Sequence, residues 1–275
     1  MEGRFQARCS WGAPGLSISW LLVALAASAA AVLAYGWFEA GWLRTRVLEV
    51  PIAGLPAALD GLRIAHLSDF HLGLPSRGPV AVRRAAGWVR ERRPDLVVVT
   101  GDLLSHPRGR EQLDGVLGGL DAFAVLGNHD VGVTRDPFSR PAELAGLAAT
   151  VLVDEARTLE VRGSRVQLAG VRAFFDAPAP PADRGAGLRV LLSHYPRLQD
   201  EGYELVLAGH KHAGQIVIPL PRGKVRLAHP RSRLNEGIYR AGRVTLHVSP
   251  GLGTTFVPFR IFARPEATEL VLRSA

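Results

Sequence analysis

The sequence predicts a layered α/β domain that follows one N-terminal apolar helix, and three features of its 275 residues lead to this fold class. Short apolar runs rich in valine, leucine and isoleucine recur along the chain, as in strands that are buried on both faces. Helix-like stretches lie between some of these runs, which is the pattern of a sheet covered by helices. A long segment near the N-terminus carries no charge. We therefore divide the chain into an N-terminal flank (1–15), a transmembrane helix or signal anchor (16–38), a connector (39–60) and a globular domain (61–275).

The first element is the apolar segment. Residues 9–38 contain no Asp, Glu, Lys or Arg. At about 1.5 Å per residue, a helix over 16–38 is long enough to cross the roughly 30 Å hydrocarbon core of a bilayer. Tryptophans are typical of membrane boundaries, and four of the five lie in or beside this segment: Trp11, Trp20, Trp37 and Trp42. A single membrane span is the prediction; a buried core helix and a cleaved signal peptide led by Arg4 and Arg8 are the alternatives. The arginine counts on the two flanks are equal, so the orientation stays open.

The domain then alternates strands and helices. Five buried strands are expected at 62–67, 96–100, 123–126, 188–192 and 205–208. Helices are expected over 80–92, which ends before a proline, and more weakly over 111–117 and 141–149. Alternation of polar and apolar residues through 158–161 and 165–168 predicts a hairpin around Gly163. Later strands are expected at 244–248 and 269–272.

Composition limits the possible functions. With 47% hydrophobic residues the chain is not intrinsically disordered. Cys9 is the single cysteine, which excludes a disulfide framework, a thiolate zinc site and an iron–sulfur cluster. The formal charge is +8, and four basic and four acidic residues precede Gly61, so the surplus belongs to the domain. This favours anionic partners or simply a solvated basic surface. Nucleic acid is disfavoured, because no basic stretch is interleaved with aromatic residues for base stacking.

Each of the five expected strands ends in polar residues, and ligands bind at the carboxyl ends of strands in such folds. These ends supply seven potential metal ligands: Asp69, His71, Asp102, Asn128, His194, His210 and His212. Carboxylate, imidazole and amide oxygen suit Mn²⁺, Fe²⁺ or Zn²⁺. Each strand end alone has an ordinary structural explanation as a turn or a core histidine, but their combination predicts a metal site. Asp102 has two oxygens and can bridge two ions. Two ions about 3.5–4 Å apart hold a hydroxide and clamp an in-line displacement at phosphorus.

In this order the residues resemble the motifs of the calcineurin-like metallophosphoesterase superfamily, D-x-H, G-D, G-N-H-[DE], H and G-H-x-H, all present between Asp69 and His212. The resemblance implies a four-layer αββα sandwich with two divalent metal ions. One ion would be bound by Asp69, His71 and His212, the other by Asn128, His194 and His210, and Asp102 would bridge them. His129 would protonate the leaving oxygen or stabilise charge in the transition state, and Asp130 would orient it.

More narrowly, the chain is similar to the membrane-anchored bacterial branch related to YaeI and YkuE, through Trp42-Leu43, Gly54-Leu55-Pro56 and Gly209–Gln215 among other segments. Members of that branch include enzymes that cleave the pyrophosphate of UDP-2,3-diacylglucosamine in lipid A synthesis. Protein phosphatases of the superfamily carry an Asp-Arg pair where this chain has Ser105 and His106, which disfavours that class. Candidate phosphate contacts are Arg77, His106 and Arg108, each of which also fits a solvated loop.

The expected function is therefore a bacterial, single-pass membrane-anchored hydrolase with two metal ions. It would cleave a phosphoester or pyrophosphate bond of a lipid-linked or nucleotide-linked substrate by attack of a metal-bridging hydroxide. A phosphorylated small molecule or lipid and the membrane are the expected partners, and no protein partner is implied. The alternatives are a nuclease of the same superfamily and a non-catalytic membrane sensor on the same fold. The metal, the substrate and the side of the membrane are open at this point.

Overall fold

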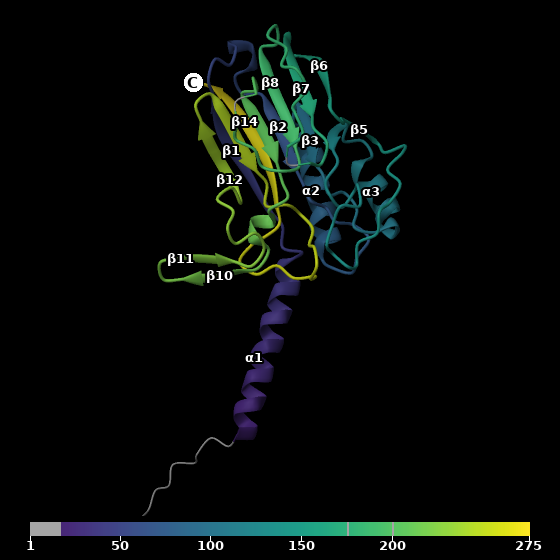
Figure 1. Ribbon diagram of the computed structural model, residues 1–275, viewed down its shortest axis with the longest axis vertical. Helices are drawn as coiled ribbons and strands as arrows, with labels where there is room; N and C mark the ends of the chain where they lie inside the picture. Colours follow the sequence, from purple (N-terminus) through teal and green to yellow (C-terminus); the bar gives the residue numbers. More distant parts are fainter. Residues whose placement is uncertain (1–17, 175, 200) are drawn as a thin grey trace, which may run out of the picture. The chain divides into compact units, whose positions relative to one another are not determined.

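The computed structural model describes residues 18–174, 176–199 and 201–275, and its contacts divide the chain into two units, 1–35 and 36–275. Helix α1, Ile18–Glu39, contains the described part of the first unit (Figure 1). By length and composition α1 can cross a membrane, and none of its apolar stretch is buried in the protein, which argues against a core helix. The expected helix over 16–38 is thus found, apart from residues 16 and 17, which lie outside the described residues.

The first sheet has six strands in the order β1-β14-β2-β3-β4-β5. Strand β14 is parallel to β1 and antiparallel to β2, and the rest of the sheet is parallel. The bounds are β1 Arg44–Ile52, β2 Arg63–Leu67, β3 Leu96–Thr100, β4 Ala122–Val125, β5 Ala149–Val151 and β14 Glu266–Ser274. The expected connector is therefore wrong over residues 44–52, which form an edge strand of the domain.

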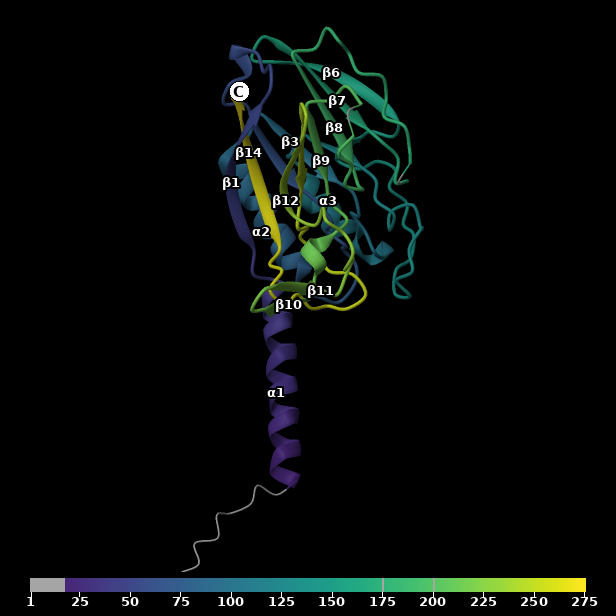
Figure 2. The ribbon, with the colours of Figure 1, turned by 60° about the vertical axis from the view of Figure 1, so that its left-hand side comes forward.

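The second sheet also has six strands, in the order β12-β13-β9-β8-β7-β6, and faces the first (Figure 2). Its bounds are β6 Glu155–Val161, β7 Ser164–Gly170, β8 Leu188–Ser193, β9 Leu205–Ala208, β12 Gly237–Ala241 and β13 Val244–Val248. The hairpin predicted around Gly163 is confirmed, since β6 and β7 pair antiparallel and Gly163 has a φ of 72°. A separate hairpin, β10 Val217–Leu220 with β11 Gly223–Arg226, projects from the domain (Figure 1).

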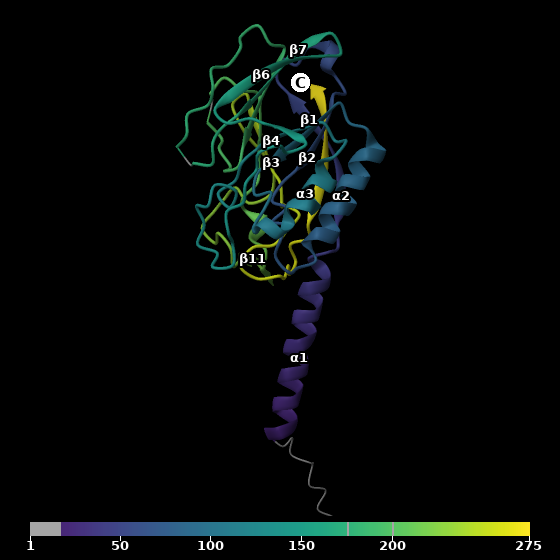
Figure 3. The ribbon, with the colours of Figure 1, turned by 90° about the vertical axis from the view of Figure 1, so that its right-hand side faces the viewer.

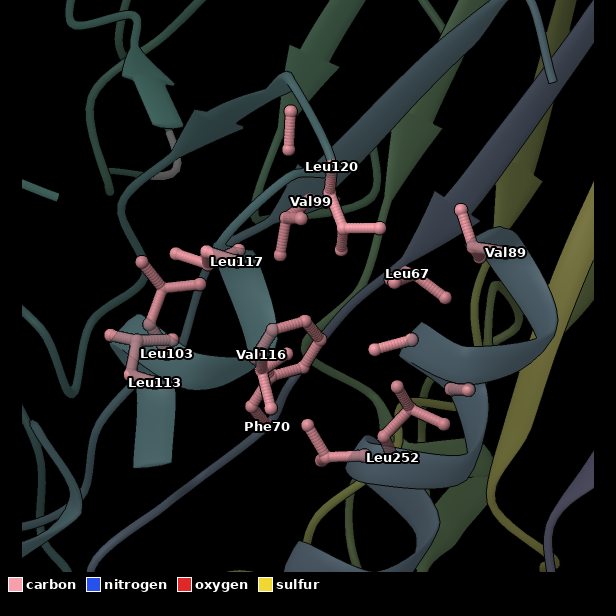
Figure 4. Packing of buried hydrophobic residues seen from close by; sticks show 14 of the residues in the cluster. Leu67, Phe70, Val89, Val99, Leu103, Leu113, Val116, Leu117, Leu120 and Leu252 are labelled. Atoms are coloured by element: carbon pink, nitrogen blue, oxygen red, sulfur yellow. The ribbon is translucent and has the colours of Figure 1, made fainter. Parts of the chain in front are cut away.

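Helices α2, Gly78–Arg92, and α3, Arg110–Leu117, cover one face of the first sheet (Figure 3). Their buried side chains, Val82, Ala85 and Val89 from α2 and Leu113 and Leu117 from α3, pack on the outer residues of β2 and β3. Figure 4 shows Phe70 and Leu252 packed within this cluster. In the sequence, Phe70 lies between the predicted site residues Asp69 and His71. The strand ends that carry the site are thus fixed by close packing. Short 3₁₀ turns lie at 57–59, 107–109 and 212–214.

A second core fills the space between the two sheets, with Val98 and Leu270 on one side and Leu192 and Leu207 on the other. The α/β class is confirmed. Within the described residues, however, no α-helix covers the outer face of the second sheet. Loop residues bury that face instead, so the expected fourth layer is built from irregular chain; examples are Val171, Ala177 and Tyr203.

The helix expected over 141–149 is wrong. The segment is irregular up to β5, and two of its carbonyls, those of Glu143 and Ala145, accept hydrogen bonds at 2.9 Å from the guanidinium of Arg110. The Arg110 side chain thus satisfies two carbonyl groups that backbone N–H groups would satisfy in a helix.

Glu269 on β14 is a buried carboxylate held by Arg63 and Arg92, with Nη2–Oε distances of 2.8 and 2.7 Å. Burial alone would raise its pKa, but the hydrogen bonds from Arg92 and Arg63 outweigh burial and lower the pKa from 4.5 to about 2. The ionised form therefore stabilises the fold above pH 4.5, and this contribution is lost as the pH falls through 2.

We expect Glu269→Gln to lower the free energy of unfolding by about 2 kcal/mol at pH 7, allowing for screening of the partly exposed arginines. The difference from wild type should shrink between pH 4.5 and about pH 2, as measured by chemical denaturation. Glu49→Gln is the matched control, because Glu49 pairs with Arg273 at the surface and is 68% exposed. Equal losses in the two variants, or a difference that persists undiminished in acid, would contradict the assignment.

Candidate dinuclear metal site

The five predicted strand ends meet at one edge of the two facing sheets, after β2, β3 and β4 of the first sheet and β8 and β9 of the second. Several of the turns are strained. Positive φ angles of 47° to 71° occur at Asp69, His71, Asp102, His210 and His212. Non-glycine residues in this region are uncommon and cluster at functional sites, where the surrounding structure holds them in place.

The first donor set consists of Asp69, His71, His212 and Asp102, all buried, with ligand atoms within 4.8 Å of one another. His71 Nε2 lies 3.1 Å from His212 Nε2, and His212 Nε2 lies 3.4 Å from Asp69 Oδ1. Ligands of a tetrahedral or octahedral ion with bonds near 2.1 Å are separated by roughly 3.0 to 3.4 Å. These donors therefore fit around one divalent ion.

The second donor set consists of Asp102, His194 and His210. Asn128 adds its amide oxygen, because Asn128 Oδ1 lies 3.1 Å from His194 Nε2. His194 Nε2 is also 3.1 Å from His210 Nδ1. All seven residues expected as ligands are thus brought together, in the two groups that the motifs implied.

Asp102 joins the two sets through one oxygen. Its Oδ2 atom lies 3.3 Å from His71 Nε2 and 3.3 Å from His194 Nε2. Its Oδ1 atom accepts a hydrogen bond of 2.9 Å from the backbone N–H of His129. One oxygen therefore faces both donor sets while the other fixes the carboxylate to the loop after β4.

Neighbouring groups orient two of the histidines. His194 Nδ1 lies 2.8 Å from the carbonyl oxygen of Thr100, which can only accept, so Nδ1 carries the proton. His71 Nδ1 lies 2.8 Å from Ser105 Oγ. Such contacts orient metal-binding imidazoles and leave the other nitrogen free to bind. Ser105, which departs from the protein-phosphatase pattern, therefore contacts a predicted ligand.

Burial and the neighbouring charges shift the pKa values of the donors in different directions. Burial raises the pKa of Asp102, but the His194 and His71 imidazoles outweigh it and hold the pKa well below 3.8. Burial lowers the pKa of His194, and Asp102 more than offsets this, raising it to about 9. Burial holds the pKa of His71 well below 6.5. Metal binding at the second donor set must therefore displace a proton from His194.

Two motif glycines are required by close approach. A Cβ atom on Gly127 would collide with the carboxylate and backbone nitrogen of Asp102. A Cβ atom on Gly209 would collide with Ser68 Oγ and Asp69 Oδ2. Glycine at these positions lets the chain pass directly beside the donors.

His129 is buried beside the first donor set, with its ring edge-on to His71 at 4.5 Å between centroids. Its Nδ1 lies 2.8 Å from Ser139 Oγ, and its Nε2 lies 3.1 Å from Thr134 Oγ1 and 3.4 Å from Thr255 Oγ1. Burial lowers its pKa, against the opposing effect of Asp102. The ring is thus neutral at pH 7 and is held by hydroxyl groups.

Asp130 does not orient His129, contrary to expectation. Its carboxylate accepts hydrogen bonds of 2.8 to 3.1 Å from the backbone N–H groups of Gly127, Leu103 and Leu104. Burial and the Asp102 charge raise its pKa to about 7, against these hydrogen bonds. Asp130 therefore ties the loop after β3 to the loop after β4, and Ser139 takes the orienting position.

The donors open into a pocket of about 760 Å³. Its walls include residues that the sequence analysis missed, among them Thr134, Arg135, Tyr195, His229, Thr255 and Phe256. The ring centroid of His210 lies 4.8 Å from that of His229 and 4.5 Å from that of Tyr195. Tyr195 directly follows the motif residue His194, whereas the other five lie at loop positions outside the motifs, where the sequence pattern gives no signal.

The expected phosphate contacts are not among the described residues that line this pocket. His106 accepts a hydrogen bond from the backbone N–H of Arg108 and so caps a 3₁₀ turn. The side chain of Arg77 lies against Gly41, and Arg108 is exposed. Arg135 is the arginine that lines the pocket.

Comparison with known proteins agrees with this geometry. The sequence profile of the calcineurin-like phosphoesterase family matches residues 62–214. The "Transmembrane protein with metallophosphoesterase domain" of Danio rerio is 30% identical over 83% of this chain, which spans 57% of that protein's length. The "Uncharacterized metallophosphoesterase YkuE" of Bacillus subtilis is 30% identical, covering 86% of this chain and 88% of its own. The "UDP-2,3-diacylglucosamine pyrophosphatase LpxG" of Chlamydia trachomatis is 27% identical, covering 82% and 89%.

Proposed function

The chain belongs to the calcineurin-like phosphoesterase family and is a metal-dependent phosphoesterase, and from this premise we propose that it is a membrane-anchored enzyme with two divalent metal ions. The observation that carries the proposal is the position of Asp102 Oδ2, 3.3 Å from a histidine of each donor set. A single oxygen shared in this way suits a pair of ions. Bound together, Mn²⁺, Fe²⁺ or Zn²⁺ ions would activate the nucleophile and neutralise charge on the phosphoryl oxygens.

The side chains around the donors would bind and orient the substrate. His129 lines the pocket; when Ser139 donates to its Nδ1, the proton stands on Nε2, where Thr134 Oγ1 accepts it at 3.1 Å until a substrate oxygen takes that place. Arg135 supplies a guanidinium at the pocket wall for the phosphate. Tyr195 also lines the pocket, and burial and the Asp102 charge raise its pKa to about 12, so its hydroxyl stays protonated at pH 7.

We propose further that the substrate is a lipid-linked or nucleotide-linked phosphate at the cell membrane. The apolar helix α1 and the name of the Danio rerio relative support a membrane location. The name of the Chlamydia relative supports a substrate like UDP-2,3-diacylglucosamine. A basic domain at an anionic membrane surface would attract such substrates.

The test is hydrolysis by the purified full chain in detergent after loading with Mn²⁺. We expect release of p-nitrophenolate from bis-p-nitrophenyl phosphate and of UMP from UDP-2,3-diacylglucosamine, with about two ions per chain by elemental analysis. Failure on both substrates would overturn the proposal. Activity on the first alone would keep the phosphoesterase and remove the lipid-nucleotide substrate. A reporter fused after Ala275 would establish on which side of the membrane the domain lies.

A further inference from the structure

A second cavity, of about 350 Å³, adjoins the metal pocket and has a different character. The two cavities share His229, Thr255 and Phe256 as a common wall. Apolar side chains make up much of the rest, namely Ile216, Leu227, Ala228 and Val257. A ligand bound with its phosphate at the metal donors can thus extend an apolar part into this second cavity without leaving the protein surface.

The apolar residues at the mouth of this cavity are left in contact with water. Leu227 is 55% exposed, Phe256 51% and Val257 40%. Grouped apolar exposure next to a polar site is typical of a ligand groove, because an apolar ligand that covers these side chains gains hydrophobic free energy.

The cavity is formed in advance by a fixed loop. Gln215 Nε2 donates to the carbonyls of Thr255 and Val257 at 2.8 and 3.1 Å, and its Oε1 accepts from the Thr255 N–H at 3.1 Å. On the opposite wall Gly214 has a φ of 92°, and a Cβ there would lie 2.6 Å from the Arg226 side chain. The loop is therefore already ordered, and ligand binding would cost little conformational entropy.

The same loop is joined to the last turn of α1, within the unit that begins at Gly36. The Glu39 carboxylate accepts hydrogen bonds from the backbone N–H groups of Phe262 and Ala263, at 2.9 and 2.7 Å. The Gly36 carbonyl accepts one from Arg260 at 3.0 Å. Since these residues directly follow the apolar segment, a membrane-spanning α1 would place the loop at the lipid surface. The neighbouring hairpin adds exposed Arg222, which suits anionic headgroups, while Lys224 on the same hairpin pairs with Glu236 at 2.8 Å.

From these observations we propose that the apolar cavity binds an acyl chain of the lipid whose phosphate is cleaved at the metal site. The proposal rests on the proposed phosphoesterase function and adds how the lipid is selected. The phosphate lies at the donors, Phe256 separates the two pockets, and the chain lies between Leu227 and Val257. Acyl length is then a determinant of specificity.

The test uses p-nitrophenyl phosphate diesters whose second ester group is methyl, butyl or octyl, with the Mn²⁺-loaded full chain and substrate below its micelle concentration. Each methylene buried is worth several-fold in affinity, so we expect kcat/KM for the octyl ester to exceed that for the methyl ester by at least about tenfold. Leu227→Asn should reduce this ratio to within about threefold of unity. Leu227 is half exposed, so the variant should fold normally.

Leu220→Asn is the matched control, because Leu220 is 50% exposed on β10 and is outside the described residues that line the cavity. Its octyl-to-methyl ratio should equal that of wild type. Equal kcat/KM for both esters in wild type, or equal ratios in Leu227→Asn and wild type, would overturn the acyl-chain site while leaving the phosphoesterase intact. Absence of methyl-ester hydrolysis would instead contradict the proposed function itself.

Discussion

Asp102→Asn is expected to empty both donor sets at once and to lower turnover by at least about 1,000-fold. The variant keeps the size of the side chain, and its amide oxygen can still accept the hydrogen bond from the His129 backbone, which is 2.9 Å long in the wild type. The amide nitrogen then takes the place of Oδ2, 3.3 Å from both His71 Nε2 and His194 Nε2. Its two N–H groups would occupy the lone pairs of those imidazoles, which are the atoms that bind metal.

The measurement is metal content after dialysis against Mn²⁺, together with hydrolysis of bis-p-nitrophenyl phosphate. Wild type should hold about two ions and Asp102→Asn fewer than one. Asp114→Asn makes the same chemical change in a half-buried i,i+4 pair with Arg110 on α3, away from both donor sets, and should match wild type in both respects. If Asp102→Asn retained two ions, Asp102 would not be the bridge.

The metal donors were predictable because their signal is local. Each donor follows a short buried strand, and the carboxyl ends of neighbouring parallel strands lie at one edge of a sheet. Asp69, Asp102 and Asn128 follow β2, β3 and β4, which are adjacent and parallel. The position of each motif directly after a buried strand was therefore enough to predict that these donors lie close together.

The surrounding residues were not predictable, because their positions depend on pairings between distant parts of the chain. Strand β1 pairs with β14, with Arg44 opposite Glu266. No local sequence pattern predicts a partner that is so distant in the chain. Asp130 has the right residue type beside His129, yet its carboxylate turns to three backbone N–H groups nearby. Ser139 contacts His129 through an irregular loop, for which neither period nor motif gives a signal.

His129→Ala tests whether His129 acts on the substrate or supports metal binding. We expect turnover to fall by about 10²- to 10⁴-fold, the range typical of a general acid or a charge-stabilising group. Metal content should stay near two ions per chain. The backbone N–H of residue 129, which holds Asp102 Oδ1, remains in the variant. The imidazole itself belongs to neither donor set.

His106→Ala is the matched histidine variant, since His106 follows the same strand as Asp102 but caps a turn outside the metal pocket. Its turnover should lie within about twofold of wild type, because surface substitutions cost little. Loss of metal in His129→Ala would show that the ring supports the donors instead of acting on substrate. Turnover equal to wild type in both variants would mean that neither imidazole takes part. A fall in His129→Ala alone, at unchanged metal content, would separate a side chain that acts on the substrate from the side chains that bind the ions.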